Sequence, residues 1–381
     1  MKIVYLFFSF TRLAGTERIL IDKMNYLADY MGHDVTVITY EQGAHPFVFP
    51  LSKNVNRIDL DTRFFTLYKY NILKRIWLTL RMRKVFYKRY DNAIKIIHPD
   101  VVLCTTYRDF EIKAVVKCHT KAKKIIESHV NKANVLLIGN EKIKDSKIQQ
   151  IVSKWREYYM MRNISRFDCL VALTPQDAKD WKPIVQTVVI PNIITCYPNI
   201  VKKHERYKRV ISVGRLSPMK GFDIMISIWA EVVKLHPDWI LYIFGDGGER
   251  QNLETQVHNE GLEKNVIIHS AVNDIYKEYL NSDIFIMTSL FEGFGLVLIE
   301  AMSCGLPCVS FDCPNGPKEI IEEGKNGFLV PMKNNQLFVK QLCSLIEDEN
   351  LRNSMSDNAR ETSALYRPEH IMRLWENCFM E

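Results

Sequence analysis

The chain has 381 residues, of which 47% are hydrophobic and 25% are charged, and it contains nine cysteines. This composition excludes disordered and fibrous proteins, and the length fits two domains of similar size. No apolar run approaches the roughly 20 residues that a helix needs to span a bilayer. The cysteines are scattered and match no zinc-binding spacing, so we expect reduced thiols in the cytoplasm and no metal site.

The charge is divided unevenly between the two halves of the chain. Residues 1–195 contain 32 Lys and Arg against 18 Asp and Glu, a net charge of +14, whereas residues 196–381 contain 19 against 26, a net charge of −7. A basic half indicates contact with an anionic partner, such as nucleic acid, a phosphorylated substrate or a membrane surface. No nucleic-acid-binding motif accompanies the basic residues, so we expect no nucleic-acid partner.

Short apolar runs alternate with longer amphipathic stretches in both halves. In the first half, strands are predicted at Lys2–Phe8, Asp34–Thr39, Val101–Thr105, Lys124–Ser128 and Cys169–Ala172. In the second half, they are predicted at Arg209–Val213, Trp239–Phe244, Val266–His269, Ile284–Met287, Cys308–Ser310 and Gly327–Val330. This alternation predicts the α/β class, with a parallel sheet and crossover helices in each half.

The two halves are separated between residues 190 and 208, where proline and polar residues interrupt the periodicity. We therefore expect a first domain at residues 1–194 and a second at residues 195–365, followed by a tail at residues 366–381. The tail begins with a helix break, and residues 370–380 then predict a short amphipathic helix. Its apolar face carries Ile371, Leu374, Trp375 and Cys378.

Residues 63–89 form the most unusual stretch of the chain, with nine Lys and Arg and no acidic residue. Such a helix can lie on anionic lipid head groups. The alternative is a surface helix whose apolar stripe packs on its own domain and whose lysines are solvated. We expect contact with an anionic membrane surface or an anionic substrate. The stripe at helical spacing consists of Leu73, Ile76, Trp77, Leu80 and Lys84.

The first chemical motif is the run EGFGLVLIE from Glu292 to Glu300, which follows the strand predicted at Ile284–Met287. Gly293 and Gly295 permit close approach of the backbone to a ligand. The helix that begins here turns free N–H groups and the positive end of its dipole toward that ligand. The two carboxylates suit the hydroxyl groups of a sugar or a ribose, from which they accept hydrogen bonds.

The second motif is the run GRLSPMKG from Gly214 to Gly221, directly after another predicted strand. Arg215 offers a planar fork and Lys220 a mobile point charge, a combination that suits a diphosphate. Both motifs follow strands of one sheet, so they are expected at its carboxyl edge, where ligands bind in open α/β folds.

These residues together resemble glycosyltransferase family 4, whose fold is called GT-B. That fold has two Rossmann-like domains facing across an inter-domain cleft, with a C-terminal helix that crosses back to the first domain. The resemblance covers essentially the whole chain. The matching motifs are E-x7-E at Glu292 and Glu300, G-R-L-x(3–4)-K-G at Gly214–Gly221, the glycine-rich strand end at Phe244–Gly248 and the P-N pair at Pro191 and Asn192.

The resemblance implies a role for each motif residue. Arg215 and Lys220 would bind the diphosphate of a nucleotide-sugar donor, and Glu292 would hold the sugar hydroxyls. The remaining donor contacts would come from the backbone at Gly293, Phe294, Gly295 and Leu296 for the sugar and phosphate, from Glu300 for the ribose, from the backbone at Val272 for the base, and from the strand end at Gly245.

The first half matches the family less closely. The family has Gly-Gly after its first strand, whereas this chain has Ala14-Gly15, so Gly15 alone is expected at the start of a helix that borders the donor. The run Ile126–His129 resembles the strand end that presents the family's active-site histidine. A lone histidine is more often structural, and the resemblance assigns His129 a polar contact with the transferred sugar that could assist the chemistry.

The segment Phe311–Ile321 resembles a subgroup of family 4 that extends lipid-linked oligosaccharides, capsule or O-antigen repeats. Members commonly use UDP-hexoses or UDP-N-acetylhexosamines; the alternative is a proline-constrained turn that carries no information on the donor. The resemblance implies a retaining, metal-independent hexosyltransferase with no cofactor. Its partners would be a UDP-sugar and a lipid-linked or oligosaccharide acceptor, at the cytoplasmic face of a membrane.

Two other functions are compatible with this fold. A UDP-sugar 2-epimerase acts on the nucleotide sugar without an acceptor, and a non-catalytic homologue stabilises a partner transferase. The pairing of the two motifs argues against the epimerase. The intact set Arg215, Lys220, Glu292 and Glu300 argues against loss of catalysis.

Overall fold

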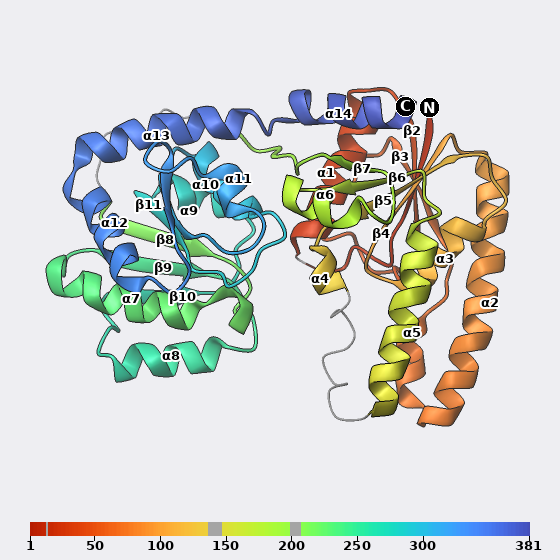
Figure 1. Ribbon diagram of the computed structural model, residues 1–381, viewed down its shortest axis with the longest axis horizontal. Coiled ribbons are helices and arrows are strands. Elements are labelled where there is room, and N and C mark those ends of the chain that lie inside the picture. The colour runs from red at the N-terminus through yellow and green to blue at the C-terminus, as the bar shows by residue number, and fades with distance from the viewer. Residues whose placement is uncertain (13, 136–146, 199–206) are drawn as a thin grey trace. The chain divides into compact units, whose positions relative to one another are not determined.

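The computed structural model describes residues 1–12, 14–135, 147–198 and 207–381. The chain forms two compact units: unit 1 comprises Met1–Ile193 and Ile371–Glu381, and unit 2 comprises Ile194–His370. Each unit contains one parallel sheet with helices packed against it (Figure 1). The predicted α/β fold with two Rossmann-like domains is therefore confirmed. Residues 199–206 of the predicted boundary segment lie outside the described residues.

The sheet of unit 1 has the strand order β3-β2-β1-β4-β5-β6-β7, and its strands are parallel. The strand order reverses beside β1 and β4, and open α/β sheets bind ligands at the carboxyl ends of the strands on either side of such a point. The bounds are β1 (Lys2–Leu6), β2 (Asp34–Thr39), β3 (Val55–Asp59), β4 (Val101–Thr105), β5 (Lys123–Ser128), β6 (Cys169–Ala172) and β7 (Thr187–Val189).

The sequence pattern does not predict β3 and β7, the two edge strands of this sheet. In β3 only Val55 is buried, and β7 consists of three half-buried residues. An edge strand has a neighbour on one side only, so it needs less apolar surface and its sequence carries a weaker signal.

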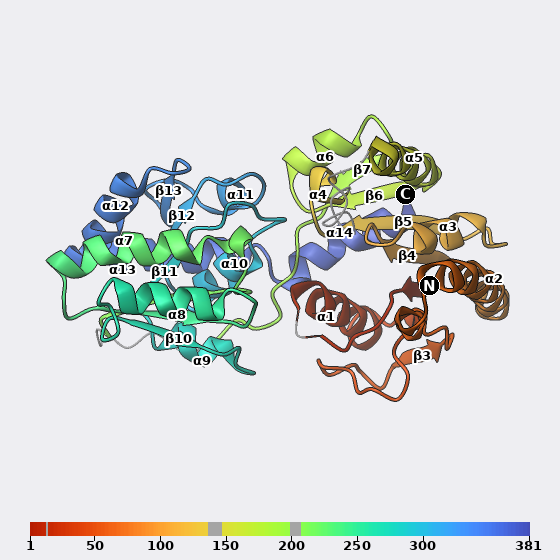
Figure 2. The same ribbon diagram turned by 90° about the horizontal axis from the view of Figure 1, so that it is seen from below.

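Two layers of helices cover the sheet of unit 1. On one face, buried residues of β1 and β4 pack with Phe86, Phe110 and Ile164 from α2, α3 and α5, which lie together on one side of the unit (Figure 2). In the described parts of the chain, no helix combines the length and the apolar character needed to cross a bilayer. The helices are α1 (Gly15–Asp29), η1 (Phe64–Lys69), α2 (Ile72–Ile97), α3 (Asp109–Lys117), α4 (Lys132–Val135), α5 (Lys147–Ile164), α6 (Pro175–Trp181) and α14 (Pro368–Met380).

The C-terminal helix α14 packs on unit 1 together with α1. The Lys23 ammonium lies 4.1 Å from the centre of the Trp375 ring, and Lys123 Nζ donates a hydrogen bond of 2.7 Å to the main-chain oxygen of Cys378. The apolar face of this helix thus lies against the first domain, although the segment that precedes the helix belongs to unit 2.

The sheet of unit 2 has the order β10-β9-β8-β11-β12-β13. Every strand predicted in this half is present, with bounds that differ by at most one residue at either end. The strands are β8 (Arg209–Val213), β9 (Ile240–Phe244), β10 (Val266–His269), β11 (Ile284–Met287), β12 (Cys308–Phe311) and β13 (Gly327–Val330). The helices are η2 (Pro218–Lys220), α7 (Phe222–Leu235), α8 (Arg250–Asn259), α9 (Ile275–Leu280), α10 (Leu296–Ser303), α11 (Pro317–Ile320), α12 (Asn335–Glu347) and α13 (Glu349–Ala364).

Backbone segments meet closely at the carboxyl edge of this sheet. A Cβ on Gly245 would lie 1.8 Å from the carbonyl oxygen of Gly214. Gly221 has a φ of +62°, and a Cβ there would lie 2.3 Å from the carbonyl oxygen of Thr288. The loops after β8, β9 and β11 are therefore in direct main-chain contact, which only glycine permits at these positions.

We expect Gly245→Ala to destabilise unit 2, because the main chain must move to admit the methyl group. Overpacking of this kind costs about 1–3 kcal/mol. The matched control is Gly248→Ala in the same loop, where an added Cβ meets nothing within 4 Å and stability should change by less than about 0.5 kcal/mol. Urea unfolding followed by circular dichroism measures both changes. Equal stabilities of the two variants would contradict this close approach.

Candidate functional site

The two chemical motifs of unit 2 lie next to each other at the carboxyl edge of the sheet. One follows β8 and the other follows β11, and these strands are paired neighbours at the point where the strand order reverses. Main-chain contacts join the two loops: Leu290 N donates to the oxygen of Met219 at 2.9 Å, and Thr288 Oγ1 donates to the oxygen of Gly221 at 2.8 Å. The fold therefore unites segments about 70 residues apart in sequence.

Lys220 and Glu292 are in direct contact within this site. Lys220 Nζ lies 2.6 Å from Glu292 Oε1, and Ser289 Oγ donates to the same oxygen at 2.6 Å. The carboxylate side chain is 9% exposed and the lysine side chain 25%. A carboxylate with so little exposure is costly unless it is paired, so each charge stabilises the other.

Arg215 differs from Lys220 because its side chain is exposed and has no hydrogen-bond or ionic partner among the described residues. The loop that carries it is fixed by its neighbour Leu216, which is fully buried and whose N–H donates to the oxygen of Asp246 at 2.9 Å. A free guanidinium on a fixed loop is available to an anion.

The run after β11 ends at the N-terminus of α10. Gly295 is the N-cap, with a φ of +89°, and no side chain caps the first turn. Uncapped N–H groups and the helix dipole together attract an anion. The preceding Phe294 is buried and its ring packs 5.8 Å from that of Tyr366, while Gly316 lies so close to its carbonyl oxygen that a Cβ would come within 2.2 Å.

Two further predicted residues, Glu300 and Gly293, also belong to this region. Glu300 is buried in the second turn of α10, and Gly293 is half-buried in the loop before the helix.

The strand ends of β9 and β10 border the same edge. Gly245 N donates to the oxygen of His269 at 3.0 Å, and the Asp246 carboxylate accepts from Ala271 N at 3.1 Å. This backbone hydrogen bond from Ala271 lowers the pKa of Asp246. It also fixes the loop that carries Val272, whose side chain is exposed.

The other two predicted residues, Gly15 and His129, belong to unit 1. Gly15 is the first residue of α1 and is exposed, and a Cβ there would meet nothing within 4 Å. Neither crowding nor a positive φ requires glycine at this position. Ala14 is the N-cap of α1 and has an extended backbone, with a φ of −135°, which an alanine adopts without strain. Thr16, in the same helical turn, shares a hydrogen bond of 2.7 Å with the hydroxyl of Tyr107. The Tyr107 ring in turn stacks near His129, with centroids 6.4 Å apart.

His129 lies in a buried charged cluster that sequence reasoning did not find. Its Nε2 is 3.1 Å from Glu127 Oε2, and Lys23 Nζ contacts the same oxygen. All three side chains are at most 4% exposed. Glu127 lies in β5 and Lys23 lies in α1. The sequence pattern of neither element indicates that a charged side chain is buried there.

The charges of this cluster depend on one another. Burial, the largest single influence, would raise the pKa of Glu127, but the Lys23 ammonium and the contact with His129 together hold the pKa below its usual value. Burial likewise lowers the pKa of Lys23, and Glu127 opposes that shift. Each charge therefore persists in the interior because the other is present.

Comparison with known proteins finds a glycosyltransferase family and glycosyltransferase relatives that this chain resembles. The family described as Glycosyl transferases group 1 matches residues 196–362. An uncharacterized glycosyltransferase of Haemophilus influenzae is 30% identical over 379 residues, which cover 98% of this chain and 99% of that protein. The amylovoran biosynthesis glycosyltransferase AmsD of Erwinia amylovora is 39% identical over 172 residues, covering 45% of this chain and 48% of that protein.

A third relative is the poly(ribitol-phosphate) alpha-N-acetylglucosaminyltransferase of Staphylococcus aureus, 28% identical over 233 residues that cover 59% of this chain and 46% of that protein. Among solved structures, a mutant of S. aureus TarM in complex with fondaparinux, alpha-GlcNAc-glycerol and UDP has a TM-score of 0.79 over 100% of both chains, at 16% sequence identity. That likeness shows the fold. The chain thus belongs to the glycosyltransferases that contain the Glycosyl transferases group 1 domain and have the GT-B fold.

Proposed function

We propose that the protein is a retaining family 4 glycosyltransferase that moves a hexose or N-acetylhexosamine from a UDP-sugar to a glycan acceptor in cell-surface polysaccharide biosynthesis. The observation that carries this proposal is the contact of Lys220 with Glu292, beside the free guanidinium of Arg215 and the uncapped N-terminus of α10. Cations and helix amides suit a diphosphate, and a carboxylate next to them suits a sugar hydroxyl.

The names of the relatives support the same substrate classes. One relative serves amylovoran biosynthesis, another transfers N-acetylglucosamine to poly(ribitol-phosphate), and the TarM structure contains UDP. The UDP of the TarM structure supports a UDP-sugar donor, and the names of the two relatives support a cell-surface polymer as acceptor.

We propose that the charged diphosphate and the neutral sugar of the donor contact different residues of the site. Arg215, Lys220 and the first turn of α10 would hold the diphosphate, while Glu292, still bound by Ser289, would accept hydrogen bonds from the sugar. The backbone at Gly293, Phe294, Gly295 and Leu296 would contact the sugar and phosphate, Glu300 the ribose and the backbone at Val272 the base. Gly245 at its strand end and Gly15 at the start of its helix would also border the donor, and His129 would contact the transferred sugar.

Transfer is proposed to occur on one face of the sugar. The acceptor oxygen forms a bond to the anomeric carbon as the bond to the UDP oxygen breaks, and the acceptor proton passes to the departing phosphate. Arg215, Lys220 and the helix dipole stabilise the negative charge that develops on UDP, so we propose that no metal is required. Glu292 stabilises the positive charge that develops on the sugar ring.

A donor screen tests this function directly. Purified protein is incubated with UDP- and GDP-hexoses and N-acetylhexosamines in excess EDTA, with and without a lipid-diphosphate oligosaccharide. We expect release of UDP that depends on the acceptor and persists in EDTA, and NMR should show that the new bond keeps the anomeric configuration of the donor. Interconversion of UDP-sugars without acceptor would identify an epimerase instead, and activity that returns only with Mg²⁺ or Mn²⁺ would refute the metal-free mechanism.

We further propose that residues 63–89 bring the enzyme to the cytoplasmic face of an anionic membrane and help to hold a lipid-linked acceptor. In the described structure the apolar members of the α2 stripe are exposed, which favours this proposal over a stripe that packs on its own domain. The exposed fractions lie between 53% and 81% for Leu73, Ile76, Trp77 and Leu80, and the preceding Ile72 is 66% exposed.

The exposed stripe lies beyond the carboxyl edge of the unit 1 sheet. The last turn of α2 is at the opposite edge, where Lys2 Nζ donates to the oxygen of Ile97 at 3.2 Å. Arg83 is level with the carboxyl end of β4, because it lies 3.6 Å from Asp109. The part of α2 that precedes Arg83 is about 16 Å long at 1.5 Å per residue, and it projects past the sheet (Figure 1).

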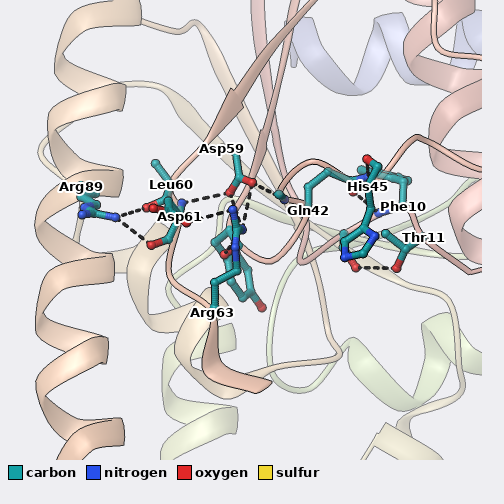
Figure 3. Close-up of polar contacts among 12 residues, drawn as sticks. Phe10, Thr11, Gln42, His45, Asp59, Leu60, Asp61, Arg63 and Arg89 are labelled. Atoms are coloured by element: carbon teal, nitrogen blue, oxygen red, sulfur yellow. Dashed lines mark hydrogen bonds and ion pairs between the residues drawn. The ribbon is translucent and has the colours of Figure 1, made fainter. Parts of the chain in front are cut away.

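Most of the cations in this stretch are free to meet an anionic surface. Arg63 is bound within unit 1, at 3.0 Å from Asp59 and 2.9 Å from Asp61, and Arg89 donates to the main-chain oxygen of Asp61 at 2.8 Å (Figure 3). With Arg83 paired as described, six cations make no ion pair with an acidic side chain among the described residues. They are Lys69, Lys74, Arg75, Arg81, Lys84 and Lys88.

We expect replacement of four of these cations by Gln to weaken binding to vesicles that contain anionic lipid. Each basic residue near such a surface contributes about 1 kcal/mol to binding, so the partition coefficient of the variant should be more than about tenfold below that of the wild type, at about 1.4 kcal/mol for each factor of ten. Binding of the wild type should itself decline at high salt, because salt screens the attraction. The variant replaces Lys74, Arg75, Arg81 and Lys84. The control with the same change of charge replaces the exposed Lys264, Lys277, Lys333 and Lys340 of unit 2.

Vesicle sedimentation and turnover of a lipid-linked acceptor are the two measurements. The control should bind vesicles like the wild type, and donor affinity should be unchanged in both variants. If the α2 variant bound anionic vesicles and used the lipid-linked acceptor like the wild type, the stretch would be an ordinary solvated surface.

A further inference from the structure

We infer that Lys23 and Glu127 are positioning residues for His129: the buried pair holds the imidazole with Nε2 toward Glu127, and Lys23 balances the charge of the Glu127 carboxylate. This inference rests on the proposed contact of His129 with the transferred sugar. Neither Lys23 nor Glu127 is part of the donor motifs.

Three secondary-structure elements build the cluster. Glu127 comes from the carboxyl end of β5, His129 follows two residues later, and Lys23 comes from the middle of α1. Glu127 Oε2 is shared: Lys23 Nζ contacts it, and His129 Nε2 lies 3.1 Å away. Because this contact occupies the Nε2 side of the ring, Nδ1 is the nitrogen left for a hydrogen bond to a sugar hydroxyl.

Two aromatic rings and a thiol border the lysine in the described structure. Tyr5 of β1 and Trp375 of α14 flank the lysine, with ring centres 5.7 Å and 4.1 Å from Nζ. Cys378 of α14 is a further titratable neighbour, and its hydrogen bond to Cys169, together with burial, raises the pKa of its thiol. The charge balance of the cluster is thus set by one ammonium, one carboxylate and one imidazole.

The cluster also contains unsatisfied polar atoms, which are rare in a folded interior. In the described structure, Tyr5 OH, Glu127 Oε1 and His129 Nε2 are buried without a hydrogen-bond partner of good geometry. Such groups mark places where stability has been given up for function or where a bound molecule completes the network. Their position around one histidine separates this cluster from an ordinary buried salt bridge.

The shared carboxylate has a defined electrostatic consequence. A carboxylate next to an imidazole favours the protonated ring, unless a second cation compensates the carboxylate. Lys23 is that cation, and it helps to hold the pKa of Glu127 below its usual value. This compensation matters for transfer, because an extra positive charge beside a sugar that itself becomes positive would repel it.

The test is the pH dependence of transfer by Lys23→Met, which keeps the length of the side chain and removes its charge. The carboxylate and imidazole then titrate as a coupled pair that retains a proton to higher pH. We expect the acid limb of the profile of kcat/KM to move up by about 1–3 pH units, with activity recovered at higher pH. The double variant Lys23→Met/Glu127→Gln removes both charges, and its acid limb should return toward that of the wild type.

Two controls separate this inference from the proposed function. Tyr5→Phe removes a hydroxyl beside the same carboxylate without changing charge, so its acid limb should stay in place. His129→Ala tests the role of the histidine itself, and full activity in that variant would refute the sugar contact whatever Lys23 does. If His129→Ala lost activity while Lys23→Met, folded by circular dichroism, kept the wild-type pH profile, the positioning role of Lys23 and Glu127 would be refuted alone.

Discussion

The contact between Lys220 and Glu292 is the interaction on which the proposed donor site depends. It joins two loops that are far apart in sequence, and it is possible because β8 and β11 are neighbours in the sheet. Gly221 allows the loops to approach, since any side chain there would collide with the backbone after β11. An anion with hydroxyl groups beside it satisfies both charges together, which is the composition of a nucleotide-sugar at its diphosphate and sugar.

A second lysine–glutamate pair occurs at the carboxyl end of the other sheet, and the difference between the pairs follows from exposure. The Lys220 side chain is 25% exposed, so its ammonium can turn from Glu292 to an incoming phosphate, whereas Lys23 is 3% exposed and has no such freedom. A partly solvated pair suits ligand binding, and a fully buried pair suits the fixed placement of a neighbouring group. Under these two proposals, the same two residue types would serve two purposes in one chain.

Sequence reasoning located most of the fold because central strands of parallel sheets are buried on both faces and read as continuous apolar runs. It missed β3 and β7, whose edge positions relax that requirement, and it missed Lys23 and Glu127, whose burial depends on a partner far along the chain. Periodicity showed that α2 has an apolar face around Trp77 but not that this face is uncovered. Composition showed Arg63 as one of nine cations but not that Asp59 and Asp61, just outside the window, neutralise it.

The contacts to the diphosphate and the contacts to the sugar can be tested separately in the proposed donor site. Isothermal titration measures UDP binding, and single-turnover experiments measure transfer of the sugar. Arg215→Ala should weaken UDP binding and slow transfer by about 10²-fold or more, because a charge-assisted contact to the diphosphate is lost. Glu292→Gln should bind UDP as the wild type does and yet fail to transfer the sugar. Loss of UDP affinity in Glu292→Gln, or unchanged UDP affinity in Arg215→Ala, would contradict the assignment of the cations to the diphosphate and of the carboxylate to the sugar.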